Sequence, residues 1–278
     1  MTATPAGRRV LVTGAARGIG AATARRLHQR GYRLALAGLE PERLGQVAAD
    51  CGGAPWYECD VGDREQVDAA VATAADMLGG LDVVIANAGV AAQLPLAGGD
   101  PSIFERTVRV NLLGTYYTLR AAAPHIAHPG GYALAVASLA AALHPPLLGA
   151  YSASKAAVEA LADTLRIELH ATGARVGVAY FAKIDTDMTA RGFGTAAARR
   201  LPDLPGTRVA PIDAAVGAIE RGVARRSRRV IAPGWVAAVL PVRALAQRIV
   251  DVGARRGLPR TLAIARSEHA PLTTTQPR

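Results

Sequence analysis

The sequence predicts an α/β protein with a parallel β-sheet that helices cover on both faces. Short apolar runs typical of strands alternate with longer segments whose apolar residues recur at helical spacing, and this alternation favours a parallel sheet with crossover helices. Half of the 278 residues are apolar, which is enough for one sizeable core. We therefore expect a single α/β domain with about seven strands.

The first strand and helix set the pattern that the rest of the chain repeats. An apolar run at residues 8–13 precedes a glycine loop and an alanine-rich helical segment at 19–29, which Gly31 ends. Further strands are expected at 32–37, 56–59, 81–86, 131–138, 175–181 and 229–232. Further helices are expected at 41–50, 64–78, 103–127 with a break near Pro124, 151–170 and 212–223.

The chain predicts one domain over residues 1–257, with two additions beside the sheet. Residues 187–209 are rich in Gly, Ala, Thr, Arg and Pro, interrupt the alternation and predict a lid over the substrate. Residues 235–254 predict an amphipathic helix broken at Pro241, whose apolar face we interpret as a core or subunit contact rather than a membrane anchor. Residues 258–278 predict a disordered tail.

The net charge of +10 is concentrated at the end of the chain. Residues 1–220 carry 20 basic and 20 acidic side chains, whereas residues 221–278 carry 12 arginines against Asp251 and Glu268. A basic segment can attract nucleic acid or anionic lipid. We interpret this one as a solvated, Arg-rich end, expect no nucleic-acid partner, and keep contact with a membrane surface as the less favoured alternative.

The sequence predicts a cytoplasmic protein without a metal site. No segment reaches the roughly 18 uninterrupted apolar residues of a membrane span. No apolar signal core precedes the first strand. Cys51 and Cys59 are not accompanied by other metal-ligating residues at the spacing of a metal site. We expect them to be inert thiols in a reducing compartment.

Tyr151 and Lys155 lie four residues apart in the segment YSASK, so a helix places both side chains on one face. A phenol has a reference pKa of roughly 10, and a nearby ammonium favours the phenolate and lowers that pKa. The pair is a candidate proton-transfer device for an alcohol or a carbonyl. The alternative is a chance pair on a helical surface, although only two of the 32 basic residues are lysines.

A glycine loop at residues 13–20, TGAARGIG, follows the first strand and opens the first helix. Glycines let the backbone turn tightly and approach a pyrophosphate, and the helix N-terminus offers N–H groups and positive potential. In this context the loop predicts a dinucleotide site on a Rossmann-type, doubly wound sheet. An ordinary tight turn is the alternative.

Taken together, the loop, the NAG at residues 87–89 and YSASK resemble the short-chain dehydrogenase/reductase family of the classical type, over about residues 7–235. The resemblance implies that Tyr151 is the general acid and base and that Lys155 activates it and binds the nicotinamide ribose. It implies that Ser138 holds the substrate oxygen and that Asn111 holds a proton-relay water. A satisfied core amide is the alternative for Asn111.

The resemblance also implies a set of cofactor-binding positions at the ends of the strands. They are Gly14, Arg17, Gly18, Ile19, Gly20, Gly38, Asp60, Val61, Asn87, Ala88, Gly89, Tyr151, Lys155, Ile184 and Thr186. A helix cap is the alternative for Asp60. The chain departs from the family pattern at Ala86, where a second asparagine is usual, and at Phe181 and Ala182, where Pro-Gly is usual.

The cofactor preference depends on the end of the second strand. An acidic side chain there would bind the ribose 2′-hydroxyl and repel a 2′-phosphate, but the chain has Gly38 at this position. Arg17 can pair with a 2′-phosphate. Both residues favour NADP(H) over NAD(H).

The segment at 139–148 between Ser138 and Tyr151 is almost wholly apolar and predicts a lipophilic alcohol or carbonyl substrate. We therefore expect an NAD(P)-dependent oxidoreductase, a homodimer or homotetramer by analogy with the family. A non-catalytic sensor of nicotinamide redox state is the alternative, because a fold alone does not establish catalysis.

Overall fold

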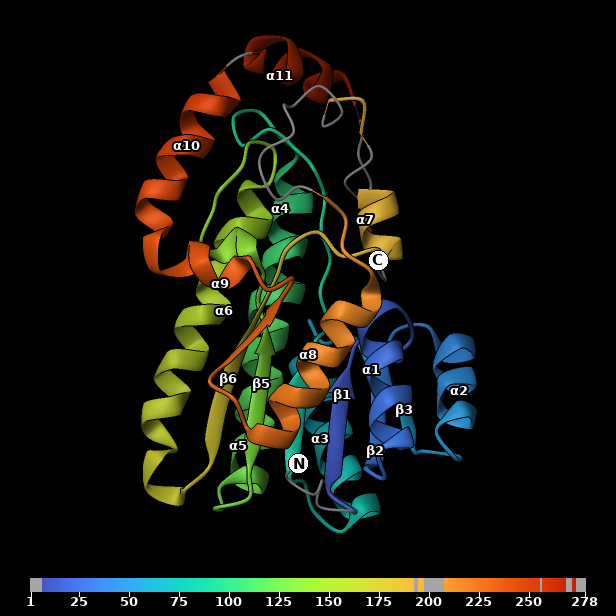
Figure 1. The fold of residues 1–278 in the computed structure, drawn as a ribbon. Coiled ribbons are helices and arrows are strands. Elements are labelled where there is room, and N and C mark those ends of the chain that lie inside the picture. The colour runs from blue at the N-terminus through green and yellow to red at the C-terminus, as the bar shows by residue number, and fades with distance from the viewer. Residues whose placement is uncertain (1–6, 193–194, 198–207, 256, 269–271, 274–278) are drawn as a thin grey trace.

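In a computed structural model of the chain, the described residues form one parallel sheet of seven strands in the order β3-β2-β1-β4-β5-β6-β7 (Figure 1). The structure describes residues 7–192, 195–197, 208–255, 257–268 and 272–273. The strands are β1 Arg9–Thr13, β2 Arg33–Gly38, β3 Trp56–Glu58, β4 Val83–Ala86, β5 Tyr132–Val136, β6 Arg175–Phe181 and β7 Arg229–Ala232. The predicted fold class and strand number are confirmed.

Helices cover both faces of the sheet, α1, α2 and α8 on one face and α3, α5 and α6 on the other (Figure 1). The helices before β6 are α1 Gly18–Gln29, α2 Pro41–Asp50, α3 Arg64–Leu78, α4 Pro101–Val108, α5 Gly114–Ile126 and α6 Gly149–Glu168. Those after β6 are α7 Asp187–Gly192, α8 Ile212–Arg225, α9 Val236–Val239, α10 Arg243–Arg255 and α11 Leu258–Ser267. Short 3-10 turns occupy Leu139–Ala141, His170–Thr172 and Leu240–Val242.

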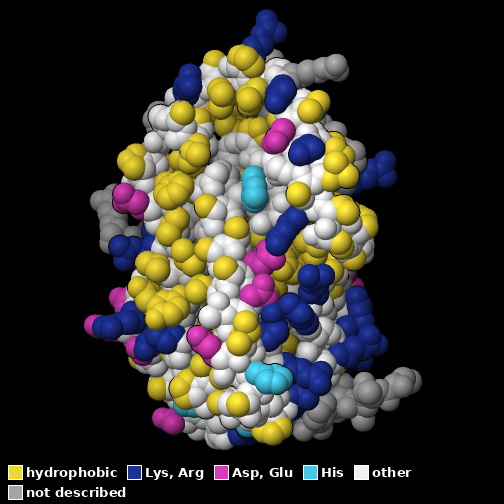
Figure 2. Space-filling view, turned by 90° about the vertical axis from the view of Figure 1, so that its left-hand side faces the viewer, with side chains coloured by type: hydrophobic (Ala, Val, Ile, Leu, Met, Phe, Trp, Pro, Cys, Tyr) yellow, Lys and Arg dark blue, Asp and Glu magenta, His cyan; other side chains and the backbone are white. Residues whose placement is uncertain are grey.

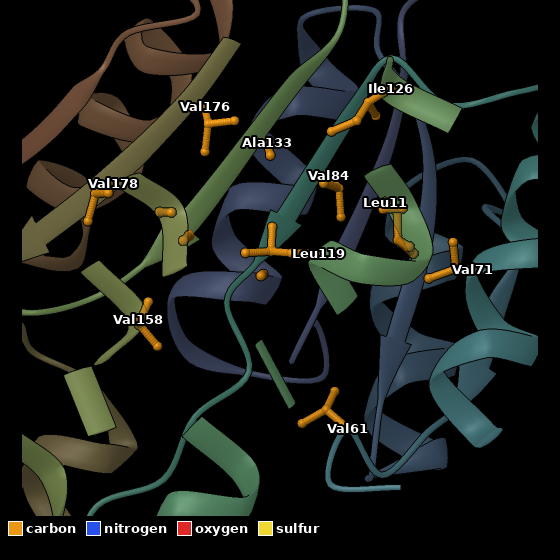
Figure 3. Close-up of a cluster of buried hydrophobic side chains, with 14 of the residues drawn as sticks. Leu11, Val61, Val71, Val84, Leu119, Ile126, Ala133, Val158, Val176 and Val178 are labelled. Atoms are coloured by element: carbon orange, nitrogen blue, oxygen red, sulfur yellow. The ribbon is translucent and has the colours of Figure 1, made fainter. Parts of the chain in front are cut away.

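Alternate residues of each central strand point to opposite faces of the sheet. Each central strand therefore contributes side chains to two hydrophobic cores, one on each face. In β1, Leu11 packs with α3 and α5, whereas Val10 and Val12 pack with α1 and α8. Figure 3 shows the first of these cores, where Leu119 of α5 and Val158 of α6 approach the sheet. Because both faces are buried, the central strands are apolar inside the sheet, and β1, β2, β6 and β7 carry a charged residue only at their first position.

The carboxyl ends of all seven strands lie at one edge of the sheet, above which α7, α10 and α11 lie in Figure 1. The strand order reverses between β1 and β4, and a doubly wound sheet opens a crevice at such a reversal. The glycine loop follows β1 and the NAG segment follows β4. The topology therefore places these two motifs on either side of the crevice.

An ion pair between Arg9 and Asp82 joins β1 to the start of β4 at the opposite edge of the sheet. The Arg9 guanidinium donates from Nη2 to Asp82 Oδ1 at 2.7 Å and from Nε to Oδ2 at 2.9 Å, and the Arg9 backbone N–H donates to Oδ2 at 2.8 Å. These bonds hold the pKa of Asp82 below its usual range. The amino edge thus carries a stabilising pair far from the crevice.

The helix predicted at 103–127 is correct in position but not regular. It consists of α4, a π-helical turn at Arg109–Leu113 and α5, and Pro124 lies inside α5 rather than breaking it. Single π turns inside α-helices shift the direction of side chains and are frequent at functional sites. Asn111 lies in this turn.

The C-terminal region is partly as predicted. The break at Pro241 is confirmed, since α9 and α10 are separated by a 3-10 turn there. The prediction of a disordered tail from 258 is wrong for α11, which begins after Gly257 and packs Leu262 and Ala265 against Leu147. The many charged residues of this segment favoured the prediction of disorder, although its few apolar residues recur at helical spacing.

Of the predicted lid at 187–209, α7 and residues 195–197 and 208–209 are described, and residues 193–194 and 198–207 lie outside the described residues. Among the described residues, no helix is both long and apolar enough to cross a bilayer.

We expect Asp82→Asn to lower the free energy of unfolding at neutral pH by about 2 kcal/mol, because charged hydrogen bonds to Arg9 are lost. The folded pKa of Asp82 is lowered, so its stabilisation is present above the unfolded pKa and is lost as the pH falls through the folded pKa. Denaturant unfolding at several pH values should show the difference from the wild type shrinking below about pH 4.

The matched control is Asp50→Asn, which breaks the more exposed ion pair with Arg25. Exposed pairs contribute little, so its loss should be much smaller. Equal losses in the two variants would contradict this account of the amino edge.

Candidate active site

A cavity of about 600 Å³ lies at the carboxyl edge of the sheet. It runs from the glycine loop past Ser138, Tyr151 and Lys155 to Trp235 and the inner side of α10. All predicted site residues line it except Gly20 and Asn111, which lie behind its walls. Residues from the ends of six strands, β1 to β6, therefore meet at one place.

The glycine loop has the geometry of a backbone cradle. Gly14 and Gly18 have φ angles of +65° and +56°, which L side chains rarely adopt. A Cβ at Gly14 would lie 2.7 Å from the Ala88 Cα, and a Cβ at Gly20 would collide with the Gly14 carbonyl. Ala88 and the Gly14 backbone occupy the space that side chains would need, so the loop stays open toward the cavity only with glycine here.

Asn87 ties the NAG segment to the glycine loop. Its Nδ2 donates to the Thr13 carbonyl at 3.0 Å and to the Gly14 carbonyl at 3.2 Å. The Thr13 hydroxyl accepts the backbone N–H of Asn87 at 3.1 Å and that of Ala88 at 3.3 Å. These bonds cross the crevice between β1 and β4 and fix its width.

Tyr151 and Ser138 face each other across the middle of the cavity. Ser138 follows β5, and its hydroxyl donates to the Phe181 carbonyl at 3.3 Å and accepts the Ala140 N–H at 3.1 Å. Burial raises the pKa of Tyr151, and a side-chain hydrogen bond with Ser138 opposes that rise. The prediction that Lys155 lowers this pKa is therefore wrong, because loss of hydration of the phenolate dominates.

Lys155 is buried in α6, one turn after Tyr151. Its Nζ donates to the Val136 carbonyl at the end of β5 at 2.7 Å and lies 5.8 Å from the centroid of the Tyr151 ring. Burial lowers the pKa of Lys155 to about 8. A Cβ at Gly89 would lie 3.3 Å from this Nζ, so Gly89 leaves room for the ammonium.

Asn111 lies fully buried in the π-helical turn and connects two walls of the site. Its Oδ1 accepts the Val90 N–H at 2.8 Å, and its Nδ2 donates to the Val90 carbonyl at 2.9 Å and to the Ser154 hydroxyl at 3.1 Å. Ser154 in turn donates to the Tyr151 carbonyl at 2.8 Å. The side-chain amide is thus fully engaged in holding the NAG segment against α6, and the predicted water relay remains a prediction.

The crevice side of the cavity contains Asp60 and Val61, two of the predicted cofactor-binding positions. Asp60 accepts the Gly62 N–H at 2.9 Å and forms an ion pair with Arg106 at 2.6 Å, while the cap of α3 is Asp63. Val61 packs against the start of α5, where a Cβ on Gly114 would overlap it. The cap alternative thus applies to Asp63 and not to Asp60.

Arg17 is bound by several groups at the mouth of the crevice. Its Nε lies 2.9 Å from Glu40 Oε2, its Nη1 lies 3.6 Å from Asp187 Oδ2, and its Nη2 donates to the Thr273 carbonyl at 2.9 Å. Thr273 also exchanges hydrogen bonds of 3.0 and 3.1 Å with the backbone of Ala91. The end of the described chain therefore reaches the crevice.

The segment after β6 keeps a defined path despite lacking Pro-Gly. The Phe181 carbonyl accepts the Ser138 hydroxyl, and the Ala182 N–H donates to the Ala232 carbonyl at 3.0 Å. Ile184 forms a parallel bridge with Ala210. These contacts bring Ile184 and Thr186 to the cavity wall.

Sequence reasoning missed several residues that hold the site. The missed residues are Thr13, Glu40, Ser154, Asp187 and Thr273. Thr13 and Ser154 lie inside the two motifs, and their hydroxyl groups were the available signal. Nothing in the sequence connects Thr273 with a loop 256 residues earlier.

The glycine loop fits a pyrophosphate, since Gly14 and Gly18 adopt backbone conformations that favour glycine and the loop leads directly into the N-terminus of α1, where no side chain caps the helix. Together, the fold and the site define a dinucleotide-dependent oxidoreductase of the α/β class. Residues 8–197 match the family model of the short chain dehydrogenases. The chain belongs to this family and is an oxidoreductase of alcohols and carbonyls that uses a nicotinamide dinucleotide.

Curated relatives agree with this assignment. An uncharacterised oxidoreductase of Staphylococcus aureus (strain MW2) is 34% identical over 183 residues, which cover 65% of this chain and 79% of the relative. The (−)-isopiperitenol/(−)-carveol dehydrogenase of Mentha piperita is 34% identical over 200 residues, which cover 69% of this chain and 76% of the relative.

We expect Lys155→Met to raise the free energy of unfolding near neutral pH by about 2 kcal/mol. Lowering the pKa of Lys155 from 10.5 to about 8 corresponds to a penalty of about 3 kcal/mol, and the lost bond to the Val136 carbonyl offsets about 1 kcal/mol. Between pH 8 and 10.5 the unfolded lysine binds more protons than the folded one, so wild-type stability rises with pH there.

Denaturant unfolding should therefore show the advantage of Lys155→Met shrinking across that window. Lys183→Met, at the only other lysine, is the control, because Lys183 is exposed and should give no such pH dependence. A destabilised Lys155→Met variant would show that burial of the ammonium is not the dominant energy.

Proposed function

We propose that the protein interconverts a lipophilic alcohol and its ketone or aldehyde, with Tyr151 as general acid and base and NADP(H) as the preferred cofactor. The supporting observation is that the Tyr151 phenol, the Ser138 hydroxyl and the Lys155 ammonium meet in one cavity that continues into the glycine cradle. Any substrate oxygen placed between Tyr151 and Ser138 has a proton donor on one side and a hydroxyl on the other.

In the reductive direction, Tyr151 delivers a proton to the substrate oxygen. The raised pKa keeps the phenol neutral at pH 7, which is the form that donates. Ser138 donates a hydrogen bond to the same oxygen and stabilises the charge that develops on it. A bound nicotinamide dinucleotide supplies the hydride in this direction and accepts it in the other.

Lys155 and Asn111 act around Tyr151 in this proposal. The Lys155 cation offsets the negative charge left on the phenol, and the ribose of the cofactor is its second expected partner. Asn111 fixes α6 against the NAG segment through Ser154 and positions Tyr151. The glycine loop, Asn87 and the segment at 184–186 would hold the dinucleotide.

The wall of the cavity beyond Tyr151 supports a lipophilic substrate. It is formed by Leu139, Leu143, Pro145, Pro146, Leu148, Trp235 and Val239. Such a surface binds apolar groups and offers few partners for charged ones. The relative from Mentha piperita is named a dehydrogenase of (−)-isopiperitenol and (−)-carveol, which agrees with an alcohol as the substrate class.

We expect Tyr151→Phe to lower kcat by at least about a hundredfold while the Kd for the cofactor changes little, since only the proton-transferring oxygen is removed. Turnover of a panel of apolar ketones and alcohols, followed at the nicotinamide absorbance, measures this. Ser152→Ala is the control, because it removes a neighbouring buried hydroxyl that has no hydrogen-bond partner among the described residues. Tight cofactor binding without turnover of any carbonyl would favour the non-catalytic sensor.

NADPH preference is expected to be modest, about tenfold in kcat/KM, because Glu40 already neutralises part of the charge on Arg17. Gly38 provides no carboxylate that would repel a 2′-phosphate. We expect Arg17→Gln to abolish the preference and Glu40→Gln to increase it. Arg43→Gln removes an exposed charge from the same cluster and should change the ratio less. Higher kcat/KM with NADH in the wild type would contradict the proposal.

A further inference from the structure

Helix α10 exposes an apolar stripe on its outer side. The exposed fractions of Leu245, Ile249 and Val252 are 61%, 59% and 64%, and their spacing of four and three residues places them on one helical face. Val242, in the turn before the helix, extends the stripe and is 50% exposed. Large apolar side chains at this exposure need an explanation when they lie side by side.

Arginines flank the stripe. Arg248 and Arg255 lie seven residues apart, so they share one side of α10 next to the stripe, and both are exposed. The region 243–268 contains six arginines and two acidic residues. One of the two, Glu268, accepts the backbone N–H groups of Ala196 and Ala197.

Figure 2 shows the side of the molecule on which α10 lies. Hydrophobic side chains gather in patches on this face, and Lys or Arg side chains stand around its upper part. A helix with an apolar face and arginines beside it has the composition of one that lies in the plane of a membrane surface.

We propose that α10 docks on an anionic lipid surface, with Leu245, Ile249 and Val252 among the acyl chains and Arg248 and Arg255 at the lipid phosphates. The complementary charge selects this partner, because each arginine near an anionic membrane adds about 1 kcal/mol to binding. The apolar stripe then anchors the helix once it has been attracted.

A second copy of the chain fits this face less well. A two-fold contact would bring the α10 helices of two copies together and place their arginine rows side by side. Asp251 is the one carboxylate on α10, and it already accepts Gln247 Nε2 at 2.8 Å. The repulsion would remain largely uncompensated, whereas anionic lipid neutralises it.

The inner side of α10 gives this docking a consequence for the substrate. Ala246, Val250 and Ala254 line the same cavity as Tyr151, and Ile249 of the exposed stripe also lines it. A docked α10 therefore places an apolar wall of the cavity next to the lipid, from which a lipophilic substrate can reach it. This consequence rests on the proposed function, but the docking itself does not.

The test is flotation of the full chain with vesicles, without cofactor or substrate, so its outcome is independent of turnover. We expect the protein to float with phosphatidylcholine vesicles that contain phosphatidylglycerol and not with pure phosphatidylcholine. High salt should reduce the bound fraction. In a Trp56→Phe variant, Trp235 is the one remaining tryptophan, and its emission should shift to the blue on the anionic vesicles.

Two double variants separate the apolar and the basic contribution. Leu245→Ser with Val252→Ser, and Arg248→Gln with Arg255→Gln, should each weaken binding roughly tenfold or more. Neither pair lines the cavity. The matched controls are Ile167→Ser, at an exposed residue of α6, and Arg25→Gln with Arg64→Gln, and they should bind like the wild type.

Three results would overturn the proposal. One is equal binding to both vesicle types. Another is binding that depends on the arginines but not on Leu245 and Val252, which indicates general attraction of a basic protein. The third is no vesicle binding together with a smaller assembly of Leu245→Ser, Val252→Ser in sedimentation velocity, which assigns the face to a second copy. Thermal melts of all variants confirm that each is folded.

Discussion

The buried ammonium of Lys155 is the interaction on which the arrangement of the site depends. It has lost its hydration and donates to one carbonyl, that of Val136, at the exact point where β5 ends. A buried charge is unfavourable unless it is paired or hydrogen-bonded. Gly89 gives it space, and the parallel sheet brings the Val136 carbonyl to it. The packing of the fold thus stabilises the Lys155 ammonium in its buried position beside Tyr151.

A second constraint keeps the two halves of the sheet in register at the crevice. Asn87 joins the loop after β1 to the segment after β4, and Asn111 joins that segment to α6. Both side chains bind backbone groups, so the spacing of the cradle and of Tyr151 is set by main-chain positions. The π-helical turn aims Asn111 at both partners, which a regular helix would not do without shifting the residue.

The fold and the central site were predictable because their signals are local. A glycine loop between a strand and a helix, and a Tyr–Lys pair one helical turn apart, each specify their own geometry within a few residues. Thr273 was not predictable, because its contact with Arg17 spans almost the whole chain. The helix α11 was missed because its few apolar residues pack with Leu147 and Ala197, which lie far away in the sequence.

The direction of the Tyr151 pKa shift could not be predicted from spacing, and it has a chemical consequence. One turn of helix places Lys155 Nζ 5.8 Å from the ring centroid, and that ammonium is already bound to a carbonyl. Its attraction for a phenolate is weaker than the loss of hydration on burial, so the neutral phenol is favoured. A neutral phenol is ready to act as an acid, whereas action as a base requires further stabilisation of the anion, for which Ser138 is the residue in place. In the proposed reaction, the neutral phenol of Tyr151 therefore favours proton donation to a carbonyl at neutral pH.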